Sequence, residues 1–267
     1  MDNMQKTAVI IPCYNEALRL KESEFIEFIQ KNKEVYFIFV NDGSRDNTLS
    51  IIHNICNINT KRMLAINLEK NNGKAEAVRQ GFLKAMEMRF DNIGYWDADL
   101  STPLYFINKF CKLMKTGRIS LVMGARVKLL GRRIRRKAYR HYMGRIFATF
   151  VSLIIGIPVY DTQCGAKIFK NNPDLQKVFS IPFTVKWIFD IEILIRLIII
   201  KSTYHSSHSL ETLCLEYPLE EWSHIHGSKL KPVDFIISLI ELFRIFLIFR
   251  IPILTNYYSK KFIETEQ

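Results

Sequence analysis

The stretch IGYWDADLSTP, residues 93–103, decides the fold class of this chain of 267 residues. Its first four residues, Ile93 to Trp96, are mostly apolar or aromatic and predict a buried strand. Asp97-Ala98-Asp99 follows at once, so two carboxylates stand where that strand ends. Two carboxylates after a strand can simply form a polar turn without a ligand. The interpretation of this motif therefore depends on the chain around it.

Similar strand-like runs occur earlier in the chain, and each is followed by a polar turn and a helix-like stretch. The pattern predicts strands at Ala8–Ile11, Val35–Val40 and Met63–Leu68, and helices at Ala17–Lys31, at Thr48–Cys56 and from Ala75 to Met86. Strands alternating with helices predict right-handed βαβ units and a parallel sheet. Ligands of such sheets bind beyond the carboxyl ends of the strands, at a topological switch point. Three polar clusters fall at strand ends and predict a nucleotide site: Asn15-Glu16, Asp42 and Asp97/Asp99.

The composition indicates a globular protein with anionic partners. Hydrophobic residues make up 48% of the chain and charged residues 24%, which argues against disorder. The 38 Lys and Arg residues against 26 Asp and Glu give a formal charge of +12, which suits nucleic acid, acidic lipid headgroups or phosphorylated substrates. The five scattered cysteines form no CxxC pair, which favours a reducing cytoplasm over a disulfide framework or zinc site. The N-terminus does not read as a signal peptide.

The second half of the chain has a different character. Residues 126–145 carry nine Lys or Arg and no Asp or Glu, and apolar stretches follow at 146–159 and 235–254. The first is too short to span a bilayer. Charged residues interrupt the second, so we expect an amphipathic helix in the membrane interface. A basic run is most often a solvated face, but an apolar run directly behind it favours a membrane surface over nucleic acid.

Individual motifs allow more than one interpretation. Hard divalent cations bind oxygen ligands, and carboxylates and phosphates can bind the same cation together. Asp97 and Asp99 therefore suit a metal–diphosphate site. Asp42-Gly43-Ser44 is either a type I turn or a nucleotide contact. Lys74 stands at a helix start, where the helix dipole disfavours a cation unless an anion binds there. Three histidines have no partner at metal-ligand spacing and are expected to be ordinary surface or core residues: His141, His224 and His226.

Taken together, several motifs resemble family 2 inverting glycosyltransferases of the GT-A fold. Those of the first half are VIIPCYNE (9–16), VNDGSRDNT (40–48), NNGKAEAVRQGF (71–82) and DADLSTP (97–103). Those of the second half resemble the dolichyl-phosphate β-glucosyltransferases and their polyprenyl-phosphate relatives: GARV (124–127), DTQCGAKIF (161–169), WIFDIEIL (187–194) and the segment 222–229. The resemblance covers about residues 6 to 245. The chain departs from it at Lys167, where relatives carry an aromatic residue, and lacks the N-terminal membrane anchor of the eukaryotic glucosyl enzymes.

The resemblance implies an α/β, Rossmann-like GT-A fold, in which helices flank a mostly parallel central sheet and amphipathic interface helices follow at the C-terminus. It implies a glycosyltransferase domain at residues 1–230. Its nucleotide-sugar half would be 1–125 and its acceptor half 126–230. Residues 231–267 would form a segment that meets a membrane or a second copy of the chain.

The resemblance also implies roles for individual residues. The nucleotide-binding pocket would be lined by Pro12, Tyr14, Asn15, Glu16, Asp42, Lys74 and Asp97. Mg²⁺ or Mn²⁺ would be held by Asp97 and Asp99. The acceptor phosphate would meet Arg126, Arg145 and Gln163. The residues nearest the reaction would be Asp99, Asp161, Asp190 and Arg126.

The expected activity is the metal-dependent transfer of a hexose from a UDP-sugar to a polyprenyl or dolichyl phosphate, with inversion. We expect it at the cytoplasmic face of a membrane, without a nucleic-acid partner. One alternative is a family 2 transferase that acts on a saccharide or a cell-surface polymer. Another is a nucleotide-binding membrane adaptor with a degenerate site. A Rossmann oxidoreductase is the weakest alternative, because no GxGxxG follows the first strand.

Overall fold

The computed structural model describes residues 5–135, 138–203, 210–223, 225, 232–251 and 260. The chain forms two compact units. Unit 1 consists of residues 1–122 and 165–171, and unit 2 of residues 123–164 and 172–267. The chain therefore leaves unit 1 after its first part and returns to it for one short segment.

Unit 1 is built on a mostly parallel sheet in which five strands follow the order β3-β2-β1-β4-β7. The strands are β1 (Thr7–Cys13), β2 (Val35–Asp42), β3 (Met63–Leu68), β4 (Asn92–Trp96) and β7 (Ala166–Lys170). β1 pairs in parallel with both β2 and β4, and β2 with β3, whereas β7 runs antiparallel to β4. The mostly parallel sheet expected from the sequence is confirmed, together with its first four strands.

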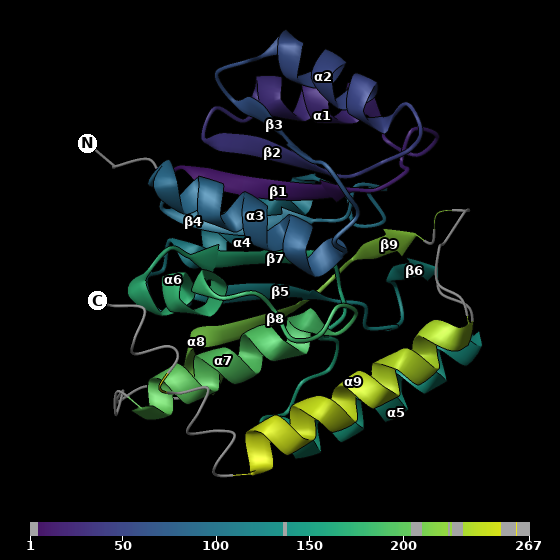
Figure 1. Ribbon diagram of the computed structural model, residues 1–267, viewed down its shortest axis with the longest axis vertical. Helices are drawn as coiled ribbons and strands as arrows, with labels where there is room; N and C mark the ends of the chain where they lie inside the picture. Colours follow the sequence, from purple (N-terminus) through teal and green to yellow (C-terminus); the bar gives the residue numbers. More distant parts are fainter. Residues whose placement is uncertain are drawn as a thin grey trace. The chain divides into compact units, whose positions relative to one another are not determined.

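Four helices of unit 1 cover this sheet (Figure 1): α1 (Glu22–Lys31), α2 (Thr48–Ile58), α3 (Lys74–Glu87) and α4 (Tyr105–Met114). Phe25 of α1 packs edge-on against Phe37 and Phe39 of β2. Phe82 of α3 packs in the same way against Tyr95 of β4. β1 and β2 are buried along almost their whole length, as expected for strands covered on both faces.

The first helix begins later than the sequence predicts. Residues 17–19 form a turn instead of the start of a helix. The amides of Arg19 and Leu20 both donate to the carbonyl of Glu16, and the amide of Ala17 donates to the Asp46 carboxylate. These bonds tie the segment to the loop beyond β2, so helical spacing alone placed the helix start too early.

The strand order creates the switch point at which α/β sheets bind ligands. The chain runs from β1 outward through β2 to β3, and then returns to place β4 on the other side of β1. The strand order therefore reverses between β1 and β4, and α/β sheets bind ligands at the carboxyl ends of the strands on either side of such a reversal. Asn15-Glu16 and Asp97/Asp99 lie in these two loops.

Unit 2 combines short strands with longer helices. β5 (Leu121–Ala125) neighbours β8 (Cys214–Pro218), and β6 (Arg133–Arg135) pairs in parallel with β9 (Glu221–Ser223). Its helices are α5 (Ala138–Ile155), α6 (Pro173–Ser180), α7 (Phe189–Thr203), α8 (Leu210–Leu213) and α9 (Pro232–Arg250). In Figure 1 α5 lies largely behind α9, and the two helices contact each other.

The basic run and the first apolar stretch share one helix, because α5 begins within the former and ends within the latter. Gly156, at φ 75°, follows its last residue and provides the left-handed turn that commonly ends a helix. Among the described residues, no helix is both long enough and apolar enough to cross a bilayer. His224, His226 and the side chain of His141 lie outside the described residues.

Candidate active site

The loop after β1 is fastened to the loop after β2. The amide of Asn15 donates to Ser44 Oγ at 2.9 Å, and Asn15 Oδ1 accepts from the amide of Arg45 at 2.8 Å. The amide of Glu16 donates to Thr48 Oγ1 at 2.7 Å. Asn15 has a φ of 49°, a conformation that asparagine tolerates better than most residues. The segment from Pro12 to Glu16, predicted to line the nucleotide, is thereby held at the carboxyl end of β1.

Arg19 connects this loop to the carboxylates after β4. Its guanidinium forms an ion pair with Glu16, and its Nη1 lies 3.9 Å from Asp99 Oδ2. Sequence reasoning missed Arg19, because it lies in a segment predicted as helix. Its spacing of three residues from Glu16 was the one available signal, and such spacing is common on solvent-exposed helices.

Asp97 and Asp99 stand directly beyond β4 with partly exposed carboxylates, at 36% and 22% of their side-chain surface. Lys74 Nζ donates to Asp97 Oδ1 at 2.6 Å. Asp99 Oδ1 accepts from the amide of Ser101 at 3.0 Å, which fixes the turn. Neither carboxylate is buried in the core, so both can reach a ligand.

Gly165 provides the space that the Asp97 carboxylate occupies. A Cβ atom built on Gly165 would lie 2.0 Å from Asp97 Oδ2 and 2.2 Å from its Cγ. The Gly165 carbonyl also accepts the Asp97 amide at 2.9 Å. The glycine of the DTQCG motif therefore determines where the Asp97 carboxylate lies, a role that the sequence did not reveal.

Asp42 is only 2% exposed and holds the turn before α3. Its Oδ1 accepts the amide of Asn72 at 2.8 Å and its Oδ2 that of Gly73 at 2.9 Å. Burial raises the pKa of this carboxyl above its ordinary value, although the two amide donors oppose the shift. Asp42 thus fixes the backbone that presents Lys74 at the first position of α3.

The pair Asp97 and Asp99 fits a divalent cation by its chemistry, because both offer the hard oxygen ligands that Mg²⁺ and Mn²⁺ prefer. Among the described residues, no group of three or more His, Cys, Asp or Glu side chains could enclose an ion. Water and a bound molecule could complete the ligands of a cation on these two carboxylates. Diphosphates supply such ligands.

In unit 2, Arg126 and Asp161 form a nearly buried two-point ion pair. Arg126 Nε and Nη2 donate to the two Asp161 oxygens at 2.6 and 2.7 Å, and the Arg126 amide donates to Oδ2 at 3.0 Å. Paired bonds of this kind fix both the position and the plane of a guanidinium. The Trp222 ring lies 5.3 Å from the same guanidinium.

Glu216 on β8 holds the backbone that carries Asp161. Its Oε2 accepts the amide of Tyr160 at 2.7 Å and its Oε1 that of Asp161 at 2.8 Å. A chain of contacts thus runs from Glu216 through Asp161 to Arg126. Sequence reasoning missed Glu216, and the signal for it was weak: an acidic residue inside the short run CLEYP.

Arg126, Arg145, Asp161 and Gln163 line one pocket in unit 2, together with Gly144, Phe147, Ala148, Tyr160 and Thr162. The Arg145 guanidinium lies 3.7 Å from the centre of the Tyr160 ring. Gln163 Nε2 is buried without a hydrogen-bond partner among the described residues. The structure therefore brings together all three side chains predicted to hold an acceptor phosphate. Asp190 is buried in the first turn of α7 and does not line this pocket.

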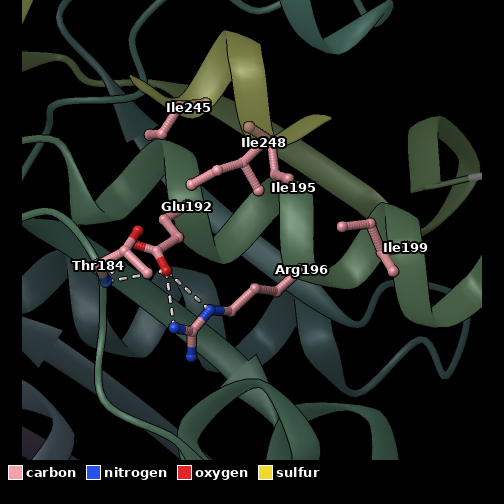
Figure 2. A pocket seen from close by; sticks show the side chains of 7 residues that line it. All are labelled: Thr184, Glu192, Ile195, Arg196, Ile199, Ile245 and Ile248. Atoms are coloured by element: carbon pink, nitrogen blue, oxygen red, sulfur yellow. Dashed lines mark hydrogen bonds and ion pairs between the residues drawn. The ribbon is translucent and has the colours of Figure 1, made fainter. Parts of the chain in front are cut away.

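A second pocket lies beside the buried pair Glu192 and Arg196, shown in Figure 2. Arg196 donates to the carbonyls of three residues that follow or end α6, and Glu192 accepts the amides of Thr184 and Val185. Besides binding each other, both side chains bind backbone groups, so we interpret the pair as a structural link between α6 and α7. Isoleucines of α7 and α9 form the rest of the pocket.

The family model described as "Glycosyl transferase family 2" matches residues 8–175, which include the carboxylates after β4, the Arg126–Asp161 pair and Gly165. The chain belongs to glycosyl transferase family 2. The prediction of this family is thus confirmed, and with it the prediction of a glycosyltransferase at the level of the family.

Similar proteins within the family include dolichyl-phosphate beta-glucosyltransferases. The enzyme of Saccharomyces cerevisiae is 34% identical over 212 residues, which cover 70% of this chain and 61% of that enzyme. The human enzyme is 27% identical over 245 residues, which cover 85% of this chain and 70% of that enzyme. The chain thus spans less than two thirds of the yeast enzyme's length.

Solved structures agree on the fold. Glucosyl-3-phosphoglycerate synthase of Mycobacterium tuberculosis, crystallised with Mn²⁺, UDP and phosphoglyceric acid, matches with a TM-score of 0.62 at 17% identity, over 91% of this chain and 78% of that one. A mannosyltransferase of Pyrobaculum calidifontis, crystallised with GDP-mannose and Mn²⁺, matches with a TM-score of 0.59 at 15% identity, over 91% of this chain and 64% of that one. The GT-A fold expected from the sequence is confirmed.

Proposed function

We propose that this protein transfers a hexose, glucose or a close relative, from a UDP-sugar to a polyprenyl or dolichyl phosphate, with inversion at the anomeric carbon. The observation that carries the proposal is the pair of partly exposed carboxylates, Asp97 and Asp99, at the switch point of the sheet, with Lys74 beside them. Relatives named dolichyl-phosphate beta-glucosyltransferases support the acceptor and the sugar.

Donor binding would fall to the loops at the carboxyl ends of the unit 1 strands. Asp97 and Asp99 would hold Mg²⁺ or Mn²⁺, and the metal-bound relatives of the same fold support a divalent ion. When bound, this ion would neutralise charge on the diphosphate leaving group. Lys74 supplies a second positive charge at the N-terminus of α3, where amide groups and the helix dipole also favour an anion. The pocket for the nucleoside would be lined by Pro12, Tyr14, Asn15 and Glu16. Asp42 would fix the turn that precedes Lys74.

Acceptor binding would fall to the pocket of unit 2. Arg145 and Arg126 provide positive charge, and Gln163 provides a buried amide that lacks a partner among the described residues. A phosphate monoester has a second pKa of roughly 6, so its oxygen is already anionic at neutral pH and needs no strong general base. Asp161 would then act as a positioning residue for Arg126. Asp190 would contribute to the reaction centre as the family resemblance implies.

The chain would work at a membrane surface, because the hydrocarbon chain of a polyprenyl phosphate anchors it in the bilayer, and we place it at the cytoplasmic face. Residues 1–125 would serve the donor and 126–230 the acceptor, whereas residues 231–267 would meet the membrane or a second copy. We expect no nucleic-acid partner.

The test is a transfer assay with radiolabelled UDP-glucose, Mn²⁺ or Mg²⁺ and a polyprenyl phosphate. We expect labelled product that partitions into organic solvent and is lost with EDTA. Label found only in a water-soluble saccharide would instead establish a saccharide or polymer acceptor. Binding of UDP without transfer to any acceptor or hydrolysis of any donor in a panel that includes GDP-mannose would indicate a degenerate site.

A further inference from the structure

Each of the two carboxylates expected to hold a divalent ion already faces a cation of the chain itself. Lys74 Nζ donates to Asp97 Oδ1 at 2.6 Å. Arg19 Nη1 lies 3.9 Å from Asp99 Oδ2. Asp99 Oδ1 accepts the amide of Ser101, so Oδ2 is the Asp99 oxygen left for a further ligand. Arg19 therefore approaches the oxygen that a divalent ion would use.

Arg19 is held in this position by its own loop. Its guanidinium forms an ion pair with Glu16, and its amide donates to the Glu16 carbonyl. Glu16 is in turn fixed to the loop beyond β2, because its amide donates to Thr48 Oγ1 at 2.7 Å. The Arg19 side chain is only 15% exposed. The guanidinium thus lies between the loop after β1 and the carboxylate of Asp99.

The contacts of Arg19 and Lys74 with the two carboxylates are of a kind that a ligand can replace. At 3.9 Å, the pair of Arg19 and Asp99 is too long for a hydrogen bond. The side chains of Lys74 and Asp97 are both more than a third exposed, and solvent screens such pairs. Neither contact therefore contributes much to the stability of the fold, and both cations can turn to a bound anion.

A divalent ion alone does not suit the charges of this cluster. Glu16, Asp97 and Asp99 contribute three negative charges. Arg19 and Lys74 already offset two of them. A divalent ion would add two positive charges beside the guanidinium and the ammonium group, which repel it. A diphosphate carries negative charge on each phosphate, so it attracts both the ion and the two side chains.

We propose that Arg19, together with Lys74, makes the binding of the divalent ion depend on the diphosphate. Without the donor, the two cations lie against the metal carboxylates and repel a free ion. The diphosphate draws both cations to its own oxygens, which releases the oxygens of Asp97 and Asp99 for the ion. The inference rests on the proposed nucleotide-sugar donor, and it assigns to Arg19 control over metal binding.

A purely structural role for Arg19 is the competing interpretation. In that case the guanidinium only holds Glu16 and Asp99 in place, and its removal would displace a metal carboxylate and weaken the binding of the free ion. Competition predicts the opposite sign, because removal of a positive charge strengthens the binding of another cation. The direction of the change therefore separates the two roles.

Binding of Mn²⁺ to the full chain without nucleotide is the deciding measurement. It is followed by the electron paramagnetic resonance signal of the free ion, at low ionic strength, where screening is weakest. Arg19→Gln removes the charge, whereas Arg19→Lys retains it without the guanidinium fork. The matched control Arg89→Gln removes an exposed arginine that precedes β4, at the opposite end of this strand from Asp97 and Asp99. UDP affinity is measured by calorimetry with Mn²⁺ and with EDTA, and circular dichroism reports the fold.

We expect Arg19→Gln to bind free Mn²⁺ about tenfold more tightly than the wild type. An ion at about 2.1 Å from Asp99 Oδ2 would lie within about 6 Å of Arg19 Nη1. A double and a single charge at that distance repel each other by about a factor of ten in binding, even in bulk water. Lys74→Gln should change the affinity in the same direction, and Arg19→Lys and Arg89→Gln should bind free Mn²⁺ as the wild type does.

With Mn²⁺ present, Arg19→Gln and Lys74→Gln should bind UDP roughly tenfold or more weakly, because each removes a charge-assisted contact to the diphosphate. The coupling between ion and nucleotide therefore falls in both variants, and it must be the same when measured from either ligand. A role in structure alone would weaken the binding of both ligands.

Unchanged or weaker binding of free Mn²⁺ by a folded Arg19→Gln variant would overturn the proposal, and so would equal tightening by Arg89→Gln. A wild type that binds UDP equally well with Mn²⁺ and with EDTA would also refute it. If Arg19→Gln does not fold, Lys74→Gln decides by the same criterion.

Transfer activity separates this proposal from the proposed function. Coupled binding of Mn²⁺ and UDP, with the expected gain in Arg19→Gln but without transfer to a polyprenyl phosphate, would refute the proposed reaction and retain the role of Arg19. Transfer by the wild type without any gain in Mn²⁺ affinity in Arg19→Gln would retain the reaction and refute that role.

Discussion

Gly165→Ala should abolish most of the activity of this protein while leaving its fold almost unchanged. The new methyl group would lie 2.0 Å from Asp97 Oδ2. Real Cβ atoms do not approach other atoms more closely than 3.0 Å, so the carboxylate must move by about 1 Å or more. The backbone at Gly165 does not have a positive φ and accepts alanine. The strain therefore falls on the end of the Asp97 side chain.

The size of each effect follows from the surroundings of that carboxylate. Displacing a catalytic group by about 1 Å costs roughly 100-fold in rate, or about 2.7 kcal/mol of transition-state stabilisation. The ion pair with Lys74 that would also be lost is more than a third exposed on both sides. Solvent screening limits such a pair to about 0–1 kcal/mol, so the Tm should fall by no more than about 4 °C.

The assay is a double-mutant cycle between Gly165→Ala and Asp97→Ala, read out as UDP affinity by calorimetry with Mn²⁺ present and as Tm. Each single variant should weaken UDP binding. In the Asp97→Ala background the methyl group no longer meets a carboxylate, so Gly165→Ala should add no further loss. Equal losses from Gly165→Ala in both backgrounds, or a Gly165→Ala variant with normal kcat/KM, would refute the reasoning.

Three further predictions concern other parts of the site. Asp99→Ala should lose turnover with an unchanged circular dichroism spectrum, and near-normal turnover of this variant in EDTA would exclude the metal assignment. Glu216→Gln leaves one of two part-buried amides facing an N–H₂ group instead of an acceptor, at about 1–3 kcal/mol; it should raise the acceptor KM and not the donor KM, whereas the exposed control Glu211→Gln should change neither. Burial opposes ionisation of Asp46, but the hydrogen bonds from Thr48 and Ala17 outweigh it and lower the pKa of Asp46 below its ordinary value of 3.8. The native state thus favours the charged form, so Asp46 stabilises the fold above about pH 4, and the Tm difference from Asp46→Asn should shrink as the pH falls below that value.

The fold was predictable because its strands are buried along their length. β2 is apolar from Val35 to Val40 and ends in a polar turn, and a parallel strand covered on both faces requires this composition. The order of the strands was not predictable from composition, since it depends on long-range pairing. The antiparallel strand β7 shows this limit, because it arrives from residues 166–170, far along the chain from β4.

The carboxylates of the site were predictable and their supports were not. Asp97 and Asp99 end a recognisable strand, so their place at the edge of the sheet follows from local sequence. Glu216 contacts Tyr160 and Asp161 across 55 or more residues, and Gly165 contacts Asp97 across 68. Contacts of this range leave no periodicity in the sequence. The residues that hold the predicted site carboxylates in place are therefore harder to predict than those carboxylates themselves.

Asp42 illustrates how the same side chain supports two interpretations until its neighbours are known. Both of its oxygens accept backbone amides of the turn at Asn72 and Gly73, and it is almost fully buried. A carboxylate with its oxygens engaged in this way stabilises the turn that begins α3, and so fixes Lys74 within 2.6 Å of Asp97. Asparagine at position 42 could accept only one of the two amides and would point its own N–H₂ group at the other. Asp42 therefore serves the geometry of Lys74, with or without a contact to the base of the nucleotide.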